Sequence, residues 1–395
     1  MHDELSPPLP PAAQTAGVDT PPPAAVLDEL RGEIDKIDEE IVDLLARRLG
    51  KVKSVVAIKK KLGLPIHHPA REENLISQRR EQAAQAGLDP DHVEELYRCI
   101  VRQSRVRQVA HVAKTGVRPG SRVLIVGGRG QMGQYLGRCF SEGGYEVRSL
   151  DTDDWPQAGQ LCQGIDLALV SVPIHFTVGV VEQLGPHLPS RCVLADITSL
   201  KKEPVSAMLR AHAGPVIGLH PLFGPSTSSM DQQLVVATPG RDAEACQWLV
   251  EQLISWGNIV LTIDAKEHDE LMDLVQGLRH FATFAFGRFL CRRQVNLGRT
   301  LEVSSPIYRL ELGMVGRMFA QDAGLYADII FASAERRALL KEFLSSLASA
   351  RELVDQGDTE QFCREFQQVT QWFGPFCDQA LRESNFLIDK LVERF

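Results

Sequence analysis

The sequence lacks the features that would place the chain in a membrane or outside the cell. It has no apolar run of about 18 residues or more, the length that a membrane-spanning helix needs. Its N-terminus has no basic segment followed by an apolar one, as a secretory signal would. The eight cysteines include no C-x-x-C pair, which argues against a zinc site or a disulfide framework. We therefore expect a cytoplasmic protein with reduced thiols and no bound metal.

Excess positive charge is also missing. The formal net charge is -8, so the chain as a whole has no general affinity for nucleic acid or other polyanions. With 395 residues, of which 44% are hydrophobic and 24% charged, the chain is long enough for several domains with large cores. Residues 1–25 are the exception, because they are rich in proline and have little to bury. We expect them to form a disordered tail.

Residues 26–114 form a helical block. Helical segments are expected over 26–62, 70–86 and 91–114, because Gly63, Pro65, Gly87 and Pro90 separate them. Helices in so short a segment, the first of them some 35 residues long, do not easily bury a compact core in one chain. The block therefore predicts a homodimer.

A different pattern begins after Pro119-Gly120, where short apolar runs alternate with helical stretches. This alternation predicts a mostly parallel sheet wrapped by helices, which makes residues 119–264 an α/β domain of the Rossmann type. From 265 to 395 strand signals are absent, and a third, all-α domain is expected, including a long amphipathic helix over 328–356. The expected strands are 122–127, 145–150, 166–172, 192–196, 215–219, 234–237 and 259–263.

Charged residues interrupt the apolar seam of the first helix. Arg31, Arg48 and Lys59 fall on the line that otherwise carries Ile34, Ile41 and other aliphatic residues. Buried cations need an anionic partner, so the seam is compatible with a site for a small anion. Long side chains that reach solvent along a drifting seam would explain the same pattern. Ser104 and Gln108 lie one turn apart on the third helical segment, and Arg71 and Glu72 begin the second.

A dinucleotide-binding motif follows the first expected strand. Gly128, Gly130 and Gly133 form G-x-G-x-x-G, in which the first glycine allows a tight turn and the second a close approach to pyrophosphate. Asp151, about 20 residues on, is placed to bind a ribose hydroxyl and favours NAD over NADP. Arg148 lies close enough to leave NADP as an alternative cofactor, although its side chain should point to the opposite face of the strand from Asp151. The predicted cofactor contacts are Gly128, Gly130, Gln131, Met132, Gly133, Asp151, Ser171, Val172 and Pro173.

A histidine ends the strand over 215–219. His220 is therefore expected at the sheet edge where α/β folds bind ligands, and Ser199, which follows the preceding strand, is placed to orient it. His175 at the same edge is a rival for the role of base. In the C-terminal part His280, Arg309 and Arg317 lie among apolar residues, where they could bind a substrate or form surface ion pairs.

Residues 27–110 resemble the all-helical chorismate mutase family, whose intertwined dimer builds each site from both chains. The resemblance implies that Arg31 is donated across the dimer to a substrate carboxylate and that Arg48 binds the second carboxylate. Lys59 and Gln108 match the donors to the ether oxygen, and Glu72 matches the acid that holds the ring hydroxyl. Arg71 and Ser104 also match site positions. His68 departs from the family, whose single-domain members often carry an acid there.

Residues 120–395 resemble the prephenate dehydrogenase family. The similarity lies in G-x-G-x-x-G, S-V-P-I-H, D-I-T-S-L-K, G-L-H-P-L-F-G-P and S-S-P-I-Y-R-L-E-L-G-M-V-G-R, in that order. It implies that His220 accepts a hydrogen bond from the 4-hydroxyl of prephenate and that Ser199 orients it. Arg317 matches the arginine that holds the ring carboxylate, and His280 a residue of the prephenate and tyrosine pocket.

Together the two matches resemble the bifunctional T-protein family. They imply rearrangement of chorismate to prephenate, NAD-dependent oxidative decarboxylation to 4-hydroxyphenylpyruvate, feedback inhibition by L-tyrosine and a homodimer. Arogenate or mixed cyclohexadienyl substrates are an alternative, because the residues that select the substrate side chain are not evident. A more distant alternative is a Rossmann oxidoreductase with a non-catalytic helical module for dimerisation or nucleic-acid binding.

Overall fold

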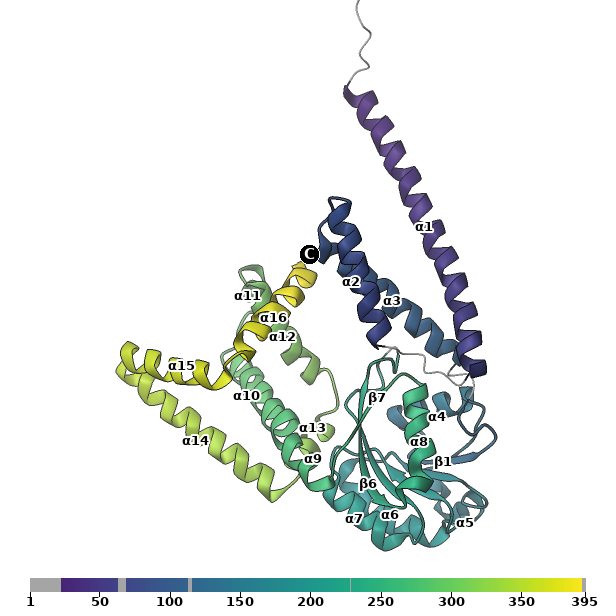
Figure 1. Cartoon of the computed structure of the whole chain (residues 1–395). Coiled ribbons are helices and arrows are strands. Elements are labelled where there is room, and N and C mark those ends of the chain that lie inside the picture. Colours follow the sequence, from purple (N-terminus) through teal and green to yellow (C-terminus); the bar gives the residue numbers. More distant parts are fainter. Residues whose placement is uncertain (1–22, 63–68, 113–115, 228, 393–395) are drawn as a thin grey trace, which may run out of the picture.

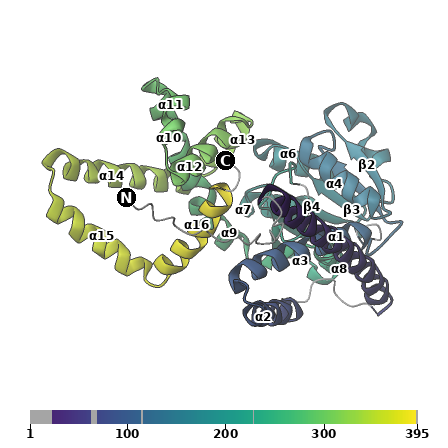
Figure 2. The same ribbon diagram turned by 90° about the horizontal axis from the view of Figure 1, so that it is seen from above.

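The structure, a computed structural model, describes residues 23–62, 69–112, 116–227 and 229–392. An all-helical part leads into a sheet flanked by helices, and a second all-helical part follows (Figures 1 and 2). This confirms the predicted fold class. Of the predicted tail over 1–25, residues 1–22 lie outside the described residues. The first helix begins at Pro23, three residues earlier than expected.

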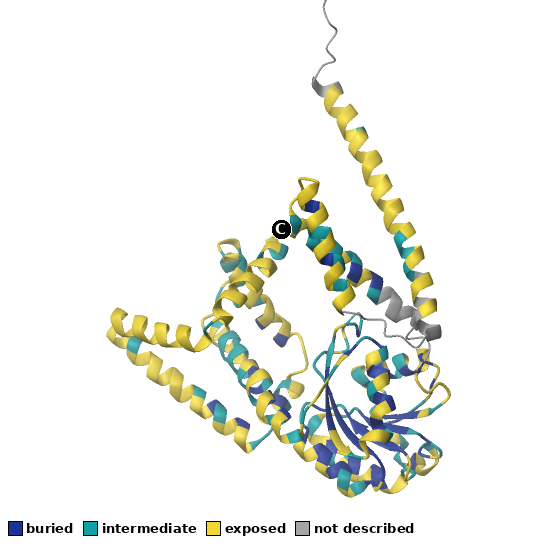
Figure 3. Ribbon diagram, viewed as in Figure 1, coloured by how far each residue is buried: buried dark blue, intermediate teal, exposed yellow. Residues whose placement is uncertain are grey.

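The N-terminal part consists of a long helix, α1 (Pro23–Leu62), and a helical hairpin of α2 (Pro69–Gln85) and α3 (Pro90–Val112). Buried Ile76, Ala83 and Val101 hold the hairpin together. Helix α1 lies against α3 only near its C-terminal end, and most of its length is exposed (Figures 1 and 3). Ile34 and Ile37 on α1 are each 56% exposed. A helix that leaves so many aliphatic residues in water needs another surface to cover them.

The central part is built on a sheet of seven strands in the order β2-β1-β3-β4-β5-β6-β7. Strands β1 to β5 are parallel, β6 runs antiparallel to β5, and β7 runs parallel to β6. Because β1 lies between β2 and β3, the crossovers diverge there and leave a crevice at the carboxyl ends of β1 and β3. The strands are β1 (Arg122–Val126), β2 (Glu146–Leu150), β3 (Leu167–Val170), β4 (Val193–Asp196), β5 (Val216–Pro221), β6 (Leu234–Arg241) and β7 (Ile259–Thr262).

Both faces of the sheet are covered. Successive side chains of a strand point to opposite faces, so Val123 and Ile125 pack towards α4 and α8, and Leu124 and Val126 towards α6 and α7. This is why the strands read as continuous apolar runs in the sequence. The covering elements are α4 (Gln131–Glu142), η1 (Thr152–Gln157), α5 (Ala158–Leu161), α6 (Ile174–Leu184), η2 (Gly185–His187), α7 (Lys202–Ala211) and α8 (Ala243–Ser255).

The C-terminal part begins with one continuous helix that lies against the sheet edge. It consists of α9 (Ala265–Met272), a π-helical turn η3 (Asp273–Leu278) and α10 (Arg279–Arg292). The remaining helices are α11 (Leu297–Glu302), α12 (Pro306–Phe319), α13 (Ala323–Ile330), α14 (Ala334–Gln356), α15 (Thr359–Phe373) and α16 (Phe376–Val392). Of these, α13 packs against α6, and the others form an open frame away from the sheet (Figures 1 and 2).

The single helix predicted over 328–356 is wrong. The chain breaks between α13 and α14, where the Ser333 hydroxyl accepts a hydrogen bond from the Arg336 backbone N–H and caps the new helix. The break places the Arg336 side chain in the interior, where it is fully buried. Its Nε donates to Asp273 Oδ1 at 2.6 Å, and Nη1 donates to the Ile329 carbonyl.

The helical parts are tied to the sheet and to each other. Arg105 of α3 pairs with Glu72 of α2 and lies 3.4 Å from Asp231, in the loop between β5 and β6. Lys390 of α16 pairs with Glu95 of α3. Among the described residues, no helix is long and apolar enough to cross a membrane.

Replacing Arg336 with Leu should destabilise the C-terminal part. The change leaves the Asp273 carboxylate without its buried cation, which costs about 3–5 kcal/mol when one partner of a buried pair is removed. Denaturant unfolding followed by tryptophan fluorescence measures the loss. The matched control is Arg351→Ala, because Arg351 forms an exposed pair with Asp355 within α14 and should contribute less than about 1 kcal/mol. Equal stability of the two variants would contradict the role assigned to Arg336.

Candidate active sites

The loop between β1 and α4 has the geometry of a dinucleotide site. The turn glycine is Gly127, with φ +83, rather than Gly128, which corrects the sequence-based assignment of the tight turn. A Cβ at Gly127 would lie 2.4 Å from the Ser171 carbonyl oxygen, and one at Gly133 would lie 2.3 Å from the Gly127 carbonyl oxygen. These contacts pack the loop against the end of β3 and the first turn of α4. Ser171 and Val172 therefore lie beside the loop, and the predicted contacts of Ser171, Val172 and Pro173 with the cofactor stay predictions.

The first turn of α4 is open to an anion. Gly130 is its N-cap and supplies no side chain to bond the free backbone N–H groups, so the helix N-terminus can receive a pyrophosphate. Gln131, Met132 and Gly133 form this turn. The residues present thus fit the diphosphate of a dinucleotide.

Asp151 lies at the carboxyl end of β2, next to the same loop. Its carboxylate accepts hydrogen bonds from the Arg129 backbone N–H at 3.1 Å and from the Ser149 hydroxyl at 2.6 Å. The Arg129 guanidinium also reaches Asp153 and Asp154. Arg148 is turned away, because it donates to the carbonyls of Leu161 and Gln163. Arg129 and Ser149 were missed in the sequence because the glycine motif leaves the residue between its first two glycines unspecified and does not reach β2.

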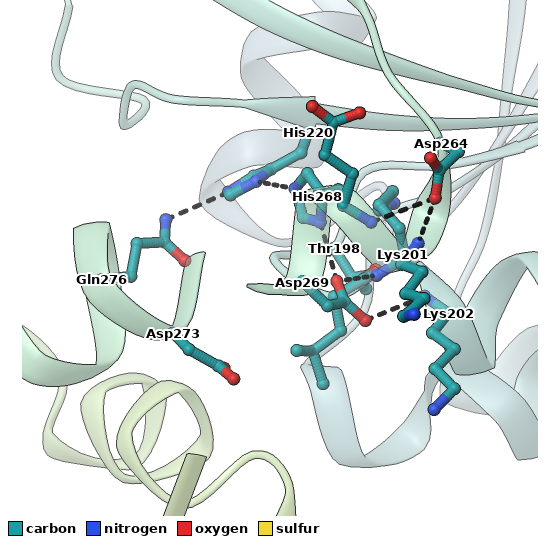
Figure 4. Close-up of polar contacts among 12 residues, drawn as sticks. Thr198, Lys201, Lys202, His220, Asp264, His268, Asp269, Asp273 and Gln276 are labelled. Atoms are coloured by element: carbon teal, nitrogen blue, oxygen red, sulfur yellow. Dashed lines mark hydrogen bonds and ion pairs between the residues drawn. The ribbon is translucent and has the colours of Figure 1, made fainter. Parts of the chain in front are cut away.

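The second feature of this part is a chain of hydrogen bonds around His220, which is buried at the carboxyl end of β5 (Figure 4). His220 Nδ1 lies 2.9 Å from His268 Nε2, and His220 Nε2 lies 3.2 Å from Gln276 Nε2. His268 Nδ1 lies 2.7 Å from Asp269 Oδ1. The Asp269 carboxylate in turn accepts the backbone N–H groups of Lys201 and Lys202 at 2.8 and 3.0 Å.

The surroundings keep His220 neutral. Burial lowers its pKa well below 6.5, and the nearby His268, Lys201 and Arg336 lower it further. Lys201 is itself fully buried beside the strand, where its Nζ donates to Asp196 Oδ2 at 2.5 Å and to the Leu219 carbonyl at 2.7 Å. Burial lowers the pKa of Lys201, and Asp196 opposes that shift.

In the structure His268, and not the predicted Ser199, is hydrogen-bonded to His220. Ser199 is half-buried in the preceding loop, but among the hydrogen bonds of the described residues it makes none to His220. The rival histidine, His175, is exposed, and its Nδ1 lies 2.7 Å from Asp328 of α13. It lines a cavity of about 510 Å³ between α6, α7 and α13 that does not include His220.

The other predicted substrate contacts come from the C-terminal helices. His280 is buried on α10 and packs edge-on against Tyr326 at 5.0 Å between ring centroids. Burial, followed by the charges of Arg279 and Arg336, lowers the pKa of His280 to about 4. Arg309 and Arg317 lie on α12, where Arg309 donates to the Leu301 carbonyl and Arg317 is exposed. A single chain therefore does not enclose Arg317.

The helical hairpin gathers part of the predicted anion site. Arg48 Nη1 of α1 donates to the Ser104 hydroxyl of α3 at 2.6 Å, and Ser104 is buried. Glu72 lies on the neighbouring helix and pairs with Arg105, which the sequence analysis did not single out. Arg71 is exposed next to Glu72. The side chains of Lys59 and Gln108, like His68, lie outside the described residues.

Arg31 cannot share a site with Arg48 of the same chain. Both residues lie on the continuous helix α1, so at 1.5 Å per residue they are about 26 Å apart along its axis. In this single chain Arg31 is exposed and pairs with Asp28 at 3.3 Å. A pocket that contains an Arg31 and an Arg48 therefore requires two chains.

Three protein-family models match successive parts of the chain. Residues 30–109 match chorismate mutase type II. Residues 148–260 match the nucleotide-binding domain of prephenate dehydrogenase, and residues 264–368 match its dimerization domain.

Individual relatives cover nearly the whole chain. The T-protein of Enterobacter agglomerans is 46% identical over 92% of this chain and 97% of its own length. The T-protein of Haemophilus influenzae is 41% identical over the same shares. The crystal structure of a prephenate dehydrogenase from A. aeolicus, in complex with hydroxyphenyl propionate and NAD+, covers 64% of this chain and 97% of its own, with a TM-score of 0.52 and 18% identity. At that identity the likeness concerns the fold.

The fold, the loop after β1 and the family matches together identify the larger part of the chain as a nicotinamide-dependent dehydrogenase, which is fused to a helical mutase domain. The chain belongs to the T-protein family. It is a bifunctional enzyme, with chorismate mutase and prephenate dehydrogenase activities, and its cofactor is NAD.

Acidification below pH 6.5 should destabilise the dehydrogenase part. His220 and His280 have lowered pKa values in the folded chain and take up protons when it unfolds, so the unfolded chain binds more protons below the ordinary pKa of 6.5. Their contribution to stability is present above that value, and that of His280 is lost progressively towards about pH 4. Thermal melts between pH 7 and 5 measure the effect. The fall should be smaller in His280→Phe, and an equal fall in this variant would contradict the assignment.

Proposed function

We propose that the chain converts chorismate to prephenate at sites shared between two N-terminal helical domains, and oxidises prephenate at a site centred on His220. One observation supports the proposed oxidation of prephenate. His220 is buried at the same sheet edge that presents the open N-terminus of α4. A base and a dinucleotide site at one edge are what hydride transfer from a small substrate requires.

The mutase residues are proposed as a cage for a dianion. Chorismate rearranges by a pericyclic step without a nucleophile or a proton transfer, so a catalyst needs shape, carboxylate clamps and positive donors at the breaking ether bond. Arg48 and Arg31 of a second chain would clamp the carboxylates. Lys59 and Gln108 would donate to the ether oxygen, and Glu72 would hold the ring hydroxyl, with Arg71 and Ser104 beside them. The exposed aliphatic face of α1 supports the second chain.

The dehydrogenase residues are proposed in separate roles. His220 accepts a hydrogen bond from the 4-hydroxyl of prephenate and supports the positive charge that develops as hydride leaves C4. Arg317 and Arg309 bind carboxylates, and His280 lines the pocket. NAD supplies the hydride acceptor. Loss of carbon dioxide makes the ring aromatic, so Arg317 must orient the leaving carboxylate without stabilising it too strongly.

The domain limits are part of this proposal. Residues 26–114 would form the mutase domain, 119–264 the NAD-binding domain and 265–395 the domain that completes the prephenate site. The limits are supported by the strands, which begin at Arg122 and end at Thr262, and by α9, which begins at Ala265. We also propose a cytoplasmic enzyme, since all eight cysteines are free thiols and four of them are exposed.

Two points of specificity remain proposals. Prephenate is favoured over arogenate on the strength of the T-protein relatives, and rates measured on both substrates would decide between them. L-tyrosine is proposed as a feedback inhibitor, because it shares the ring hydroxyl and a carboxylate with the bound substrate. We expect tyrosine, but not phenylalanine, to inhibit prephenate oxidation. Unchanged dehydrogenase activity at millimolar tyrosine would contradict this proposal.

The two activities should be separable by mutation. Arg48→Ala is expected to lower chorismate rearrangement by about 10²-fold or more, because it removes a carboxylate clamp, while NAD-dependent oxidation of added prephenate is retained. His220→Asn should have the reverse effect. Arg47→Ala is the matched control, since Arg47 is exposed on the same helix. If either Arg48→Ala or His220→Asn abolishes both activities in a folded protein, the two-site proposal fails.

Asp151 should control the choice of cofactor. Asp151→Ser is expected to raise KM for NAD and to reduce the preference for NAD over NADP by about 10-fold or more, because a carboxylate repels a 2′-phosphate. Steady-state kinetics with both cofactors measure the ratio. An unchanged ratio in a variant with unchanged stability would show that Asp151 does not contact the ribose.

A further inference from the structure

The hydrogen bonds around His220 determine which of its two ring nitrogens carries the proton. A carboxylate only accepts hydrogen bonds, so Asp269 Oδ1, 2.7 Å from His268 Nδ1, requires a proton on that nitrogen. Neutral His268 then has an acceptor at Nε2, which lies 2.9 Å from His220 Nδ1. The proton between the two rings therefore belongs to His220 Nδ1, and His220 Nε2 is left with a lone pair.

The hydrogen bond between Gln276 and His220 leads to the same assignment. The Gln276 amide nitrogen lies 3.2 Å from His220 Nε2, and an amide NH₂ group only donates. His220 Nε2 must therefore be the acceptor, and the proton must again be on Nδ1. In the free chain Gln276 occupies the position from which a substrate hydroxyl would donate.

The Asp269 carboxylate, at the far end of this hydrogen-bond series from Gln276, is held firmly in its ionised form. Burial raises the pKa of Asp269, but the hydrogen bonds from His268 and from the backbone N–H groups of Lys202 and Lys201 outweigh it, and the pKa is below its usual range. These N–H groups precede and begin α7, so the orientation of Asp269 is fixed by the sheet domain although the residue lies on α9 of the helical part.

We propose that His268 and Asp269 are positioning residues of the dehydrogenase, which hold His220 in the tautomer with a free Nε2 lone pair facing the substrate hydroxyl. This inference rests on the proposed role of His220. In the reaction the C4–H bond breaks and its electron pair leaves as hydride to NAD+. The bond from C1 to the carboxylate breaks as well, its pair enters the ring, and carbon dioxide is released. The 4-hydroxyl keeps its proton in the product, so His220 shares that proton only while positive charge passes through the ring.

The wrong tautomer would present an N–H to the hydroxyl and lose this support. Lys201 and Arg336 place two further positive charges near His220, partly balanced by Asp196 and Asp273. Asp269 supplies negative charge through His268, and it stabilises the partial charge on His220 in the transition state.

The test uses matched variants of the full chain. His268→Phe keeps the ring shape but removes both nitrogens, and kcat for prephenate oxidation should fall by about 10²-fold with KM within about twofold. His268→Gln places an amide oxygen near the lost Nε2 and should recover about a tenth of the activity or more. His212→Phe is the control, because His212 is also a buried histidine but bonds the Cys192 carbonyl far from the site. It should leave kcat unchanged.

Asp269→Asn adds two readouts that a merely structural residue would not move. Loss of the carboxylate charge should lower the pKa of His220 further, so the acid limb of the profile of kcat/KM should move to lower pH while its plateau falls. Ring ¹⁵N shifts of histidine-labelled protein, with His220 assigned by its loss in His220→Asn, should show a protonated Nδ1 in the original chain. Asp269→Asn should weaken that preference.

Different failures have different meanings. If His268→Phe and Asp269→Asn keep the original kcat and pH profile, or if Nδ1 of His220 carries no proton, the positioning role is wrong. If His220→Asn itself retains dehydrogenase activity, the proposed function fails instead. Mutase activity and the thermal melt report folding of each variant, and His268→Gln and Asp269→Asn keep the test decisive should His268→Phe not fold.

Discussion

The burial of the His220 imidazole at the carboxyl end of the sheet is the constraint on which the proposed dehydrogenase site depends. His220 sits on a strand of the sheet domain, while His268, Asp269 and Gln276 come from one helix of the following domain. The two domains therefore have to meet before the site exists. The π-helical turn within that helix, next to the fully buried Arg336, brings Gln276 to His220 and also ties the helix to α14.

The mutase part obeys a different constraint, which is the length of one helix. Arg31 and Arg48 are about 26 Å apart on a helix without a break, so one chain cannot bring them to the same small ligand. The exposed aliphatic residues of α1 point to the same solution, because a second chain would cover them and supply the missing cation. In the proposed mutase site, one surface would serve both catalysis and association.

The two enzymes are also connected within a chain. Arg105 joins Glu72, a residue of the proposed mutase site, to Asp231 in the loop that follows the strand of His220. Lys390 at the far end of the chain pairs with Glu95 of the same helical hairpin. The mutase hairpin thus contacts both parts of the dehydrogenase through charged side chains.

Much of the architecture is determined by the sequence itself. Apolar periodicity, glycine spacing and proline breaks identify the three parts, the strands and the nucleotide loop, because these depend on local backbone preferences. The positions of Asp151 and His220 at strand ends follow from the same patterns. Only the tertiary structure decided that Gly127 makes the turn, that the helix over 328–356 breaks at Ser333, and that His268 rather than Ser199 bonds His220. These depend on contacts between residues 44 or more positions apart or on a local cap that competes with helix continuation, and no periodicity along the chain encodes them.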